Sequence, residues 1–139
     1  MAGTSIIRLG AVAMILLKAS AVGAQDCPAA AVVPPAQAER GELAYKQHCR
    51  QCHGSRLSNG QFGPPLRGQQ FRNGWAGRPI GELYKSASTT MPPNAPGSLQ
   101  AADYADIIAF ILRENGVTPS DQPLPLGLEG PDCALFSPS

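Results

Sequence analysis

The sequence predicts an all-α fold, flanked by extended N- and C-terminal segments. Two stretches have the spacing of an amphipathic helix, and no βαβ pattern accompanies them. In one stretch, apolar side chains follow the i, i+3, i+4, i+7, i+8 pattern at positions 104, 107, 108, 111 and 112. Asn115 and Gly116 then end this helix, because both can adopt a left-handed conformation.

The other predicted helix begins after Pro79, a residue suited to the start of a helix. Its apolar side chains lie at positions 80, 83, 84 and 87, again with helical spacing. We expect this helix to lie beside the functional site.

Length and composition indicate one small, loop-rich domain. The 139 residues include 15 Gly and 14 Pro, and 15% are charged and 6% aromatic, which argues against a nucleic-acid-binding protein. Residues 43–81 hold six basic side chains and no Asp or Glu. We expect these to form a basic face, with scattered surface charge as the alternative. They are Lys46, Arg50, Arg56, Arg67, Arg72 and Arg78.

Residues 1–24 have the features of a secretory signal peptide. An apolar run at 9–17 is followed by Val22-Gly23-Ala24, a small-x-small cleavage pattern. The run is ended by Lys18 and is too short for a membrane span, which needs about 20 residues. We therefore expect a periplasmic protein with no membrane span after the signal is removed.

Residues 49–53 form the strongest motif in the chain. Cys49, Cys52 and His53 have the C-x-x-C-H spacing of covalent haem attachment. Two thiols three positions apart near a helix end lie on one face, where they can bond the two vinyl groups of one porphyrin. His53 is then held under the iron as the proximal ligand. The alternatives are a thioredoxin-like pair, which needs a βαβ pattern, and half of a zinc site, which needs a second Cys or His pair.

Met91 is the candidate for the opposite face of the iron. Loss of the signal peptide removes the other two methionines, and His48 lies on the same attachment segment as His53. The two prolines after Met91 restrict its loop, which suits a sulfur held at a fixed distance. A core-filling Met is the alternative, and Lys85, Asn94 or water could replace Met91 in some redox or pH state.

These motifs make the chain resemble a class I c-type cytochrome, a small monohaem electron carrier, over residues 36–116. In that family a glycine and an aromatic residue one turn later on the first helix pack against the last helix, and Gly41 and Tyr45 match them. The resemblance implies a cytochrome c fold of three to four helices wrapped around one covalent haem c, whose iron is bound by His53 and Met91. The motifs that follow Met91 are most similar to the haem domain of quinoprotein alcohol dehydrogenases.

The resemblance also assigns roles to residues around the haem. Gly63-Pro64-Pro65-Leu66 is similar to a family motif in which the proline carbonyl accepts a hydrogen bond from the proximal His and the leucine packs on the porphyrin. Pro64 and Leu66 are expected to take these roles, with an ordinary turn as the alternative. Trp75 is expected either to bond a haem propionate or to pack against the core.

The regions outside the predicted domain carry the two remaining cysteines, Cys27 and Cys133. In an oxidising compartment they are a candidate disulfide, and a bridge to a partner protein is the alternative. In the family, the first and last helices touch and bring both flanks to one side. Residues 25–35 are predicted as an extended segment and 117–139 as a Pro-rich extension that wraps the surface or contacts a partner.

The predicted function is that of a periplasmic single-electron carrier. The expected redox partners are a periplasmic dehydrogenase as donor and a terminal oxidase or another cytochrome as acceptor, with the basic residues steering an acidic partner. A haem enzyme such as a peroxidase would need a distal acid or base, and no spare His supplies one. A dedicated cytochrome subunit of a periplasmic, quinoprotein-like dehydrogenase is the alternative function.

Overall fold

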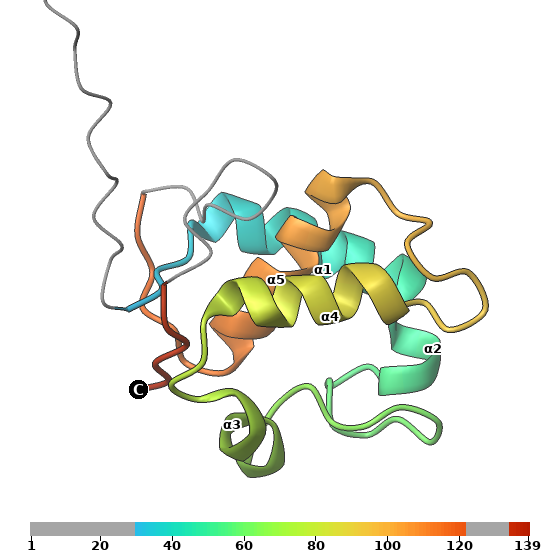
Figure 1. Cartoon of the computed structure of the whole chain (residues 1–139), viewed down its shortest axis with the longest axis horizontal. Helices are drawn as coiled ribbons and strands as arrows, with labels where there is room; N and C mark the ends of the chain where they lie inside the picture. Colours follow the sequence, from blue (N-terminus) through green and yellow to red (C-terminus); the bar gives the residue numbers. More distant parts are fainter. Residues whose placement is uncertain (1–29, 122–133) are drawn as a thin grey trace, which may run out of the picture.

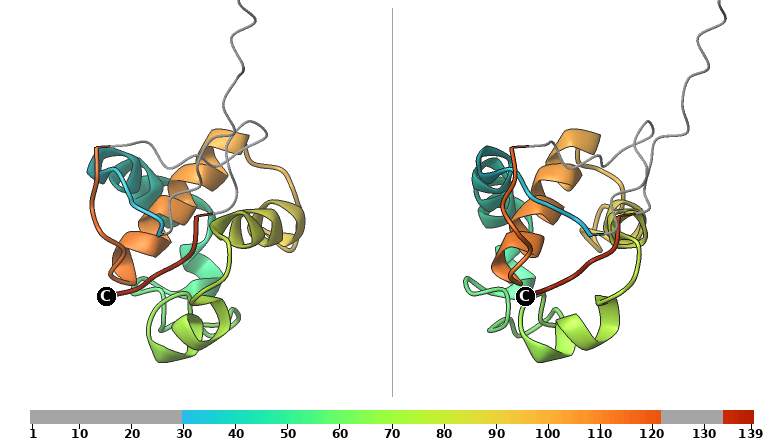
Figure 2. Two further views of the ribbon diagram at one scale, coloured as in Figure 1. Left: turned by 60° about the vertical axis from the view of Figure 1, so that its left-hand side comes forward. Right: turned by 90° about the vertical axis from the view of Figure 1, so that its left-hand side faces the viewer.

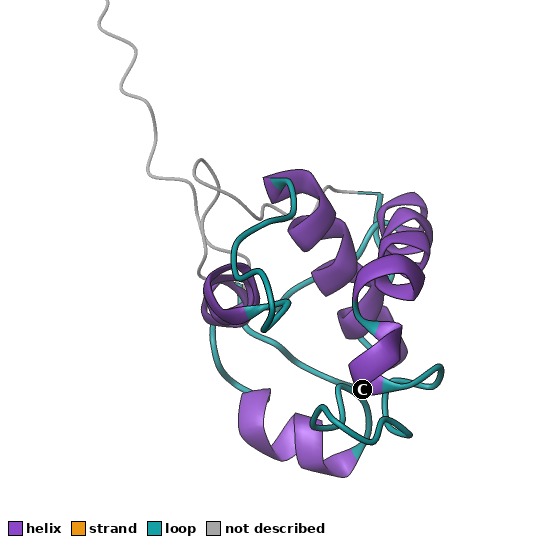
Figure 3. Cartoon of the chain, turned by 90° about the vertical axis from the view of Figure 1, so that its right-hand side faces the viewer, coloured by secondary structure: helices purple, strands orange, loops and turns teal. Residues whose placement is uncertain are grey.

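A computed structural model describes residues 30–121 and 134–139 of the chain. These residues form five helices and no β-strand, which confirms the predicted all-α class (Figure 1, Figure 3). There are more helices than the three to four expected, because the single turn α2 and the short helix α3 are separate elements. No helix in this part of the chain is long and apolar enough to cross a membrane. The helices are α1 (Pro35–His48), α2 (Arg50–His53), α3 (Gln69–Trp75), α4 (Ile80–Thr90) and α5 (Ala101–Glu114).

Helix α5 is the central element of the fold. It packs against both α1 and α4 and lies between them (Figure 2). The five positions predicted for its apolar face are all buried, and Ala105, Ala109 and Phe110 are buried as well. The Phe110 ring lies 5.3 Å from that of Tyr45 on α1, centroid to centroid. The buried surface of α5 is therefore wider than one predicted stripe, because α1 covers a second face.

The chain leaves α5 through the predicted glycine turn. Gly116 has a φ of 86°, and its N–H bonds to the Arg113 carbonyl oxygen at 3.0 Å. The Val117 N–H bonds to the Leu112 carbonyl oxygen at 3.1 Å. This pair of bonds is the Schellman arrangement, which satisfies carbonyl groups left free at a helix end. It directs Val117 into the core.

Helix α4 confirms the second predicted periodicity. Ile80 and Leu83 are buried, and the other two predicted positions pack against the core. Pro79 is the N-cap residue, directly before the first helical residue. The Gly-rich stretch before α4 contains a helix that the sequence pattern does not predict, α3, whose Phe71 is buried.

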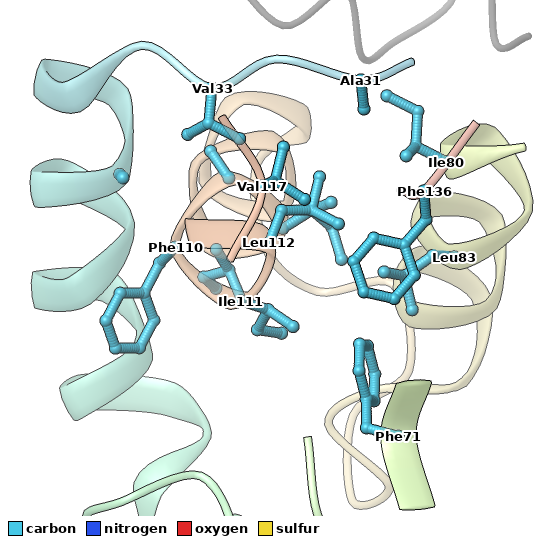
Figure 4. Packing of buried hydrophobic residues seen from close by; sticks show 14 of the residues in the cluster. Ala31, Val33, Phe71, Ile80, Leu83, Phe110, Ile111, Leu112, Val117 and Phe136 are labelled. Atoms are coloured by element: carbon cyan, nitrogen blue, oxygen red, sulfur yellow. The ribbon is translucent and has the colours of Figure 1, made fainter. Parts of the chain in front are cut away.

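The last six residues, 134–139, return to the core beside the N-terminal segment. Phe136 is buried, and its ring lies 5.8 Å from that of Phe71 (Figure 4). The main chain of this segment accepts hydrogen bonds from the N–H groups of Ala31 and Ile80, at 2.8 and 2.9 Å. The hydrophobic core therefore includes residues on both sides of the predicted 36–116 domain.

Candidate haem site

A cavity of about 590 Å³ lies among α2, α3, α4 and α5. Its volume is in the range of sites that bind small molecules and cofactors. All seven residues predicted to hold a haem line this cavity, although they come from distant parts of the chain. They are Cys49, Cys52, His53, Pro64, Leu66, Trp75 and Met91.

The two cysteines are carried by the turn that follows α1. Cys49 is the residue between α1 and α2, and Cys52 lies within α2. The N–H groups of His53 and Cys52 both bond to the Cys49 carbonyl oxygen, at 3.0 and 3.1 Å, so one tight turn carries both thiols and the imidazole. Burial raises the pKa of the Cys49 thiol to about 11, with a smaller contribution from Cys52. Cys49 is therefore a neutral thiol at neutral pH.

His53 is buried, and its ring is held by the loop that follows α2. Its Nδ1 lies 2.8 Å from the Pro64 carbonyl oxygen. Because a carbonyl can only accept, Nδ1 donates, and Nε2 keeps a lone pair that can bind a metal ion. A Cβ at Gly63 would lie 2.7 Å from the imidazole ring. Glycine at this position therefore allows the loop to approach the ring closely.

Met91 is the first residue after α4 and lines the cavity. Its N–H bonds to the Ala87 carbonyl oxygen at 3.0 Å, and its peptide bond to Pro92 is cis. Its carbonyl oxygen accepts hydrogen bonds from the Tyr104 hydroxyl at 2.6 Å and from the Gly97 N–H at 3.3 Å. The start of this loop is therefore anchored to both α4 and α5.

Leu66 and Trp75 are partly buried parts of the cavity wall. The Trp75 ring lies 6.3 Å from the Phe71 ring, centroid to centroid. The guanidinium carbon of Arg78 lies 4.3 Å from the Trp75 ring centroid, and Arg78 also forms an ion pair with Glu82. Trp75 therefore packs within the wall, and its bond to a haem propionate stays a prediction.

Two residues contribute to the site in ways that the sequence did not predict. In the sequence pattern, Tyr104 is an apolar helix position and Asn115 is part of a helix end. The structure shows the Tyr104 hydroxyl bonded to the Met91 main chain, and the Asn115 amide bonded to the Leu66 main chain. In the sequence, Tyr104 is only a hydroxyl within an apolar helix face, and Asn115 is only an amide beside a glycine. Neither pattern identifies the main-chain group that the side chain bonds.

The alternatives for the cysteine motif lack their required neighbours within residues 30–121 and 134–139. No group of three or more His, Cys, Asp or Glu side chains there could hold a metal ion. No β-strand there accompanies the cysteine pair, as a thioredoxin-like site would require. Cys27, Cys133 and the predicted signal peptide lie outside the described residues.

A family comparison covers the part of the chain that builds the cavity. Residues 36–111 match the family described as cytochrome c oxidase, cbb3-type, subunit III. The chain belongs to this family. It therefore contains a cytochrome c domain with an all-α fold, and the family implies a covalently bound haem c with iron that serves electron transfer. No curated protein and no solved structure matches the chain significantly.

The cavity of this cytochrome c domain fits the group that the family implies. Its described lining includes no Asp, Glu, Lys or Arg side chain, and apolar side chains from α4 and α5 contribute much of it. Apolar surroundings suit a porphyrin ring and raise the reduction potential of its iron. Two thiols, one imidazole and one thioether supply the chemical groups needed for covalent attachment and axial ligation.

The basic residues of the cytochrome c domain are only partly available to form a basic face. Three of the six form ion pairs with acidic side chains from outside residues 43–81, which reduces the local positive charge. These pairs are Lys46–Glu42, Arg67–Glu114 and Arg78–Glu82. Within the described residues, Arg50, Arg56 and Arg72 form no ion pair. The first two are exposed and lie on α2 and just after it.

Proposed function

We propose that this chain is a periplasmic single-electron carrier with one haem c attached through Cys49 and Cys52, and with His53 and Met91 as axial ligands. The observation that supports this function most strongly is the convergence of both thiols, the imidazole and the thioether on one cavity. Covalent thioether bonds need the two thiols, and Met/His ligation is the ligand set of cytochromes c.

The residues around the cavity have distinct roles in this function. When bound, haem iron supplies a one-electron couple between its ferrous and ferric states. The hydrogen bond from His53 to the Pro64 carbonyl oxygen orients the imidazole and makes Nε2 a stronger electron donor. If His53 and Met91 both held the iron, these two side chains would leave no position on it for a substrate. The protein then transfers electrons without substrate chemistry at the iron.

The exposed arginines near the attachment turn favour an acidic redox partner. Arg50 and Arg56 are exposed and have no acidic partner within the described residues. Attraction between unpaired surface charges speeds association and is screened by salt. The partners in this proposal are a periplasmic dehydrogenase as donor and a terminal oxidase or another cytochrome as acceptor.

A dedicated subunit of a larger complex is the second candidate function. The family description refers to a subunit of a cbb3-type oxidase, and the motifs after Met91 resemble the haem domain of quinoprotein dehydrogenases. The native mass of the protein purified from its source separates the two functions. A free carrier elutes with the mass of one chain, and a subunit elutes with its partner proteins.

Absorption spectra of the oxidised and reduced protein test the proposed site. We expect a haem that resists extraction by acidified organic solvent and a weak far-red sulfur-to-iron band in the ferric state. Met91→Ala should remove this band, and Leu99→Ala, which changes another residue of the cavity wall, should keep it. A parent protein that lacks the band and readily binds cyanide or peroxide contradicts the carrier function and favours a haem enzyme.

A further inference from the structure

Asn115, the residue that ends α5, has more hydrogen bonds than a helix end requires. Its side chain is buried, and its Nδ2 donates to the Leu66 carbonyl oxygen at 2.8 Å and to the Ile111 carbonyl oxygen at 2.9 Å. Its Oδ1 accepts from the Gly68 N–H at 3.1 Å. The helix already ends through the turn at Gly116. The bonds to Leu66 and Gly68 therefore hold the loop that contains these two residues and are not needed to end the helix.

The loop that Asn115 holds is the one that contacts His53. Pro64, whose carbonyl oxygen lies 2.8 Å from His53 Nδ1, is two residues before Leu66. The Leu66 N–H also bonds to the Leu57 carbonyl oxygen at 2.6 Å. Both main-chain polar groups of Leu66 are thus occupied, one by the preceding loop and one by Asn115. A shift of this segment would move the acceptor that orients the imidazole.

Tyr104 makes the corresponding contact at the other end of α5. Its side chain is buried, lines the cavity and donates its hydroxyl to the Met91 carbonyl oxygen at 2.6 Å. The Tyr84 ring of α4 packs edge-on against it, with 6.4 Å between centroids. The position of the Tyr104 hydroxyl is therefore fixed by packing as well as by its hydrogen bond.

We propose that α5 sets the relative positions of the two axial-ligand loops, with Tyr104 holding the Met91 loop and Asn115 holding the loop that bonds His53. The two residues are separated by eleven helical steps, about 16 Å along a stiff buried helix. Both are positioning residues, since they act through the main chain of other residues. This proposal rests on His53 and Met91 being the axial ligands.

The Met91 side of the proposal is tested with Tyr104→Phe in the haem-loaded protein. The variant keeps the ring and loses the bond to the Met91 carbonyl oxygen. We expect imidazole to displace Met91 from ferric iron at an about five-fold lower concentration, since loss of one neutral hydrogen bond shifts an equilibrium constant by about this factor. Hydrogen exchange of the Gly97 N–H, which bonds to the same Met91 carbonyl oxygen, should accelerate as well. Tyr84→Phe is the matched control, because no hydrogen bond of its hydroxyl is found in the described part of the chain. It should change neither the imidazole concentration nor the exchange rate.

The His53 side is tested with Asn115→Ala, or with the milder Asn115→Ser if the alanine variant does not fold. The Gly68 amide loses its acceptor, so its hydrogen exchange should accelerate about five-fold or more. The midpoint potential should rise, because a loosened Pro64 contact makes His53 a weaker donor. Imidazole displacement of Met91 should change less than in Tyr104→Phe. Asn73→Ala, which removes an exposed amide bonded to Gln69, is the control.

Two results would overturn the proposal. One is equal behaviour of the Tyr104→Phe and Tyr84→Phe proteins, and the other is a Gly68 amide whose exchange does not respond to Asn115→Ala. Failure of the proposed function has a different signature, which is a parent protein without covalent haem or without the Met91-dependent band. The exchange rates of Gly68 and Gly97 still test the role of α5 in that case, because they do not depend on which ligands the iron has.

Discussion

Gly41 on α1 lies directly against the main chain of Asp106 on α5. A Cβ built at position 41 would overlap the Asp106 carbonyl oxygen. Beside this contact, Arg40 Nε lies 2.7 Å from Asp106 Oδ2. One turn later, the Tyr45 ring contacts Phe110 of α5. The absence of a side chain at position 41 allows the first and last helices to cross this closely.

Gly41→Ala should destabilise the protein by about 1–3 kcal/mol, the usual cost of overpacking. The added methyl must push α5 away, which outweighs the better helix propensity of alanine, ~1 kcal/mol. Urea unfolding measures the change. Gly74→Ala in α3 is the matched control, because an added Cβ there meets nothing within 4 Å and should stabilise slightly. Equal destabilisation by the two substitutions would refute the close contact.

Phe136→Ala should lower the unfolding free energy by about 3–5 kcal/mol, as for other buried aromatic residues. Phe136 is 1% exposed and packs against Phe71, whereas the side chain of its neighbour Leu135 is 36% exposed. Leu135→Ala is therefore the control, with an expected change of about 0.5 kcal/mol. Thermal unfolding of both variants checks this. A Phe136→Ala protein that loses no more stability than the Leu135→Ala protein would mean that residues 134–139 are not part of the core.

The Glu42 carboxylate should contribute stability that is lost at acid pH. Hydrogen bonds from Lys46 and then Arg113 lower the pKa of Glu42 in the folded state. Stability from this group is therefore present above its unfolded pKa and lost as the pH falls through the folded pKa. Because the side chain is partly exposed, we expect about 0.5 kcal/mol or less.

Urea midpoints over the acid range measure this contribution in the parent and in Glu42→Gln. The parent should lose more stability on acidification than the variant does. Glu39→Gln on the same helix is the control, since Glu39 forms no ion pair within the described residues. A parent and a Glu42→Gln protein with parallel pH profiles would contradict the role of this carboxylate.

Tyr45 should remain protonated to unusually high pH. Burial, followed by the nearby Cys49, raises the pKa of Tyr45 to about 12, and its hydroxyl donates to the Gly54 carbonyl oxygen at 2.6 Å. Since the folded pKa lies above the unfolded one, stability is full below the unfolded pKa and falls as the pH rises toward 12. A tyrosinate absorbance titration should lose a step near pH 12 in Tyr45→Phe. Loss of a step near the ordinary tyrosine pKa, about 10, would show that the Tyr45 hydroxyl is accessible to solvent.

The attachment motif and the two amphipathic helices could be predicted from the chain alone. The motif at 49–53 is contiguous, so its spacing already places two thiols and an imidazole on one turn. The helices at 80–87 and 104–112 follow from a period that each segment carries within itself. Met91 and Pro64 could be proposed from elimination and from the resemblance to a family, and the structure brings them to the same cavity as His53.

Other features depend on contacts between residues far apart in the sequence. The burial of Phe136 needs Phe71, and the pairing of Arg67 needs Glu114. No local pattern identifies such partners, which explains why the sequence predicted a basic face of six residues and a C-terminal extension that wraps the surface or contacts a partner. The same holds for the amide of Asn115, whose bond to Leu66 spans 49 positions. Covalent chemistry and helical period are properties of neighbouring residues, whereas the arrangement of a polar group and its acceptor is decided only when the helices pack.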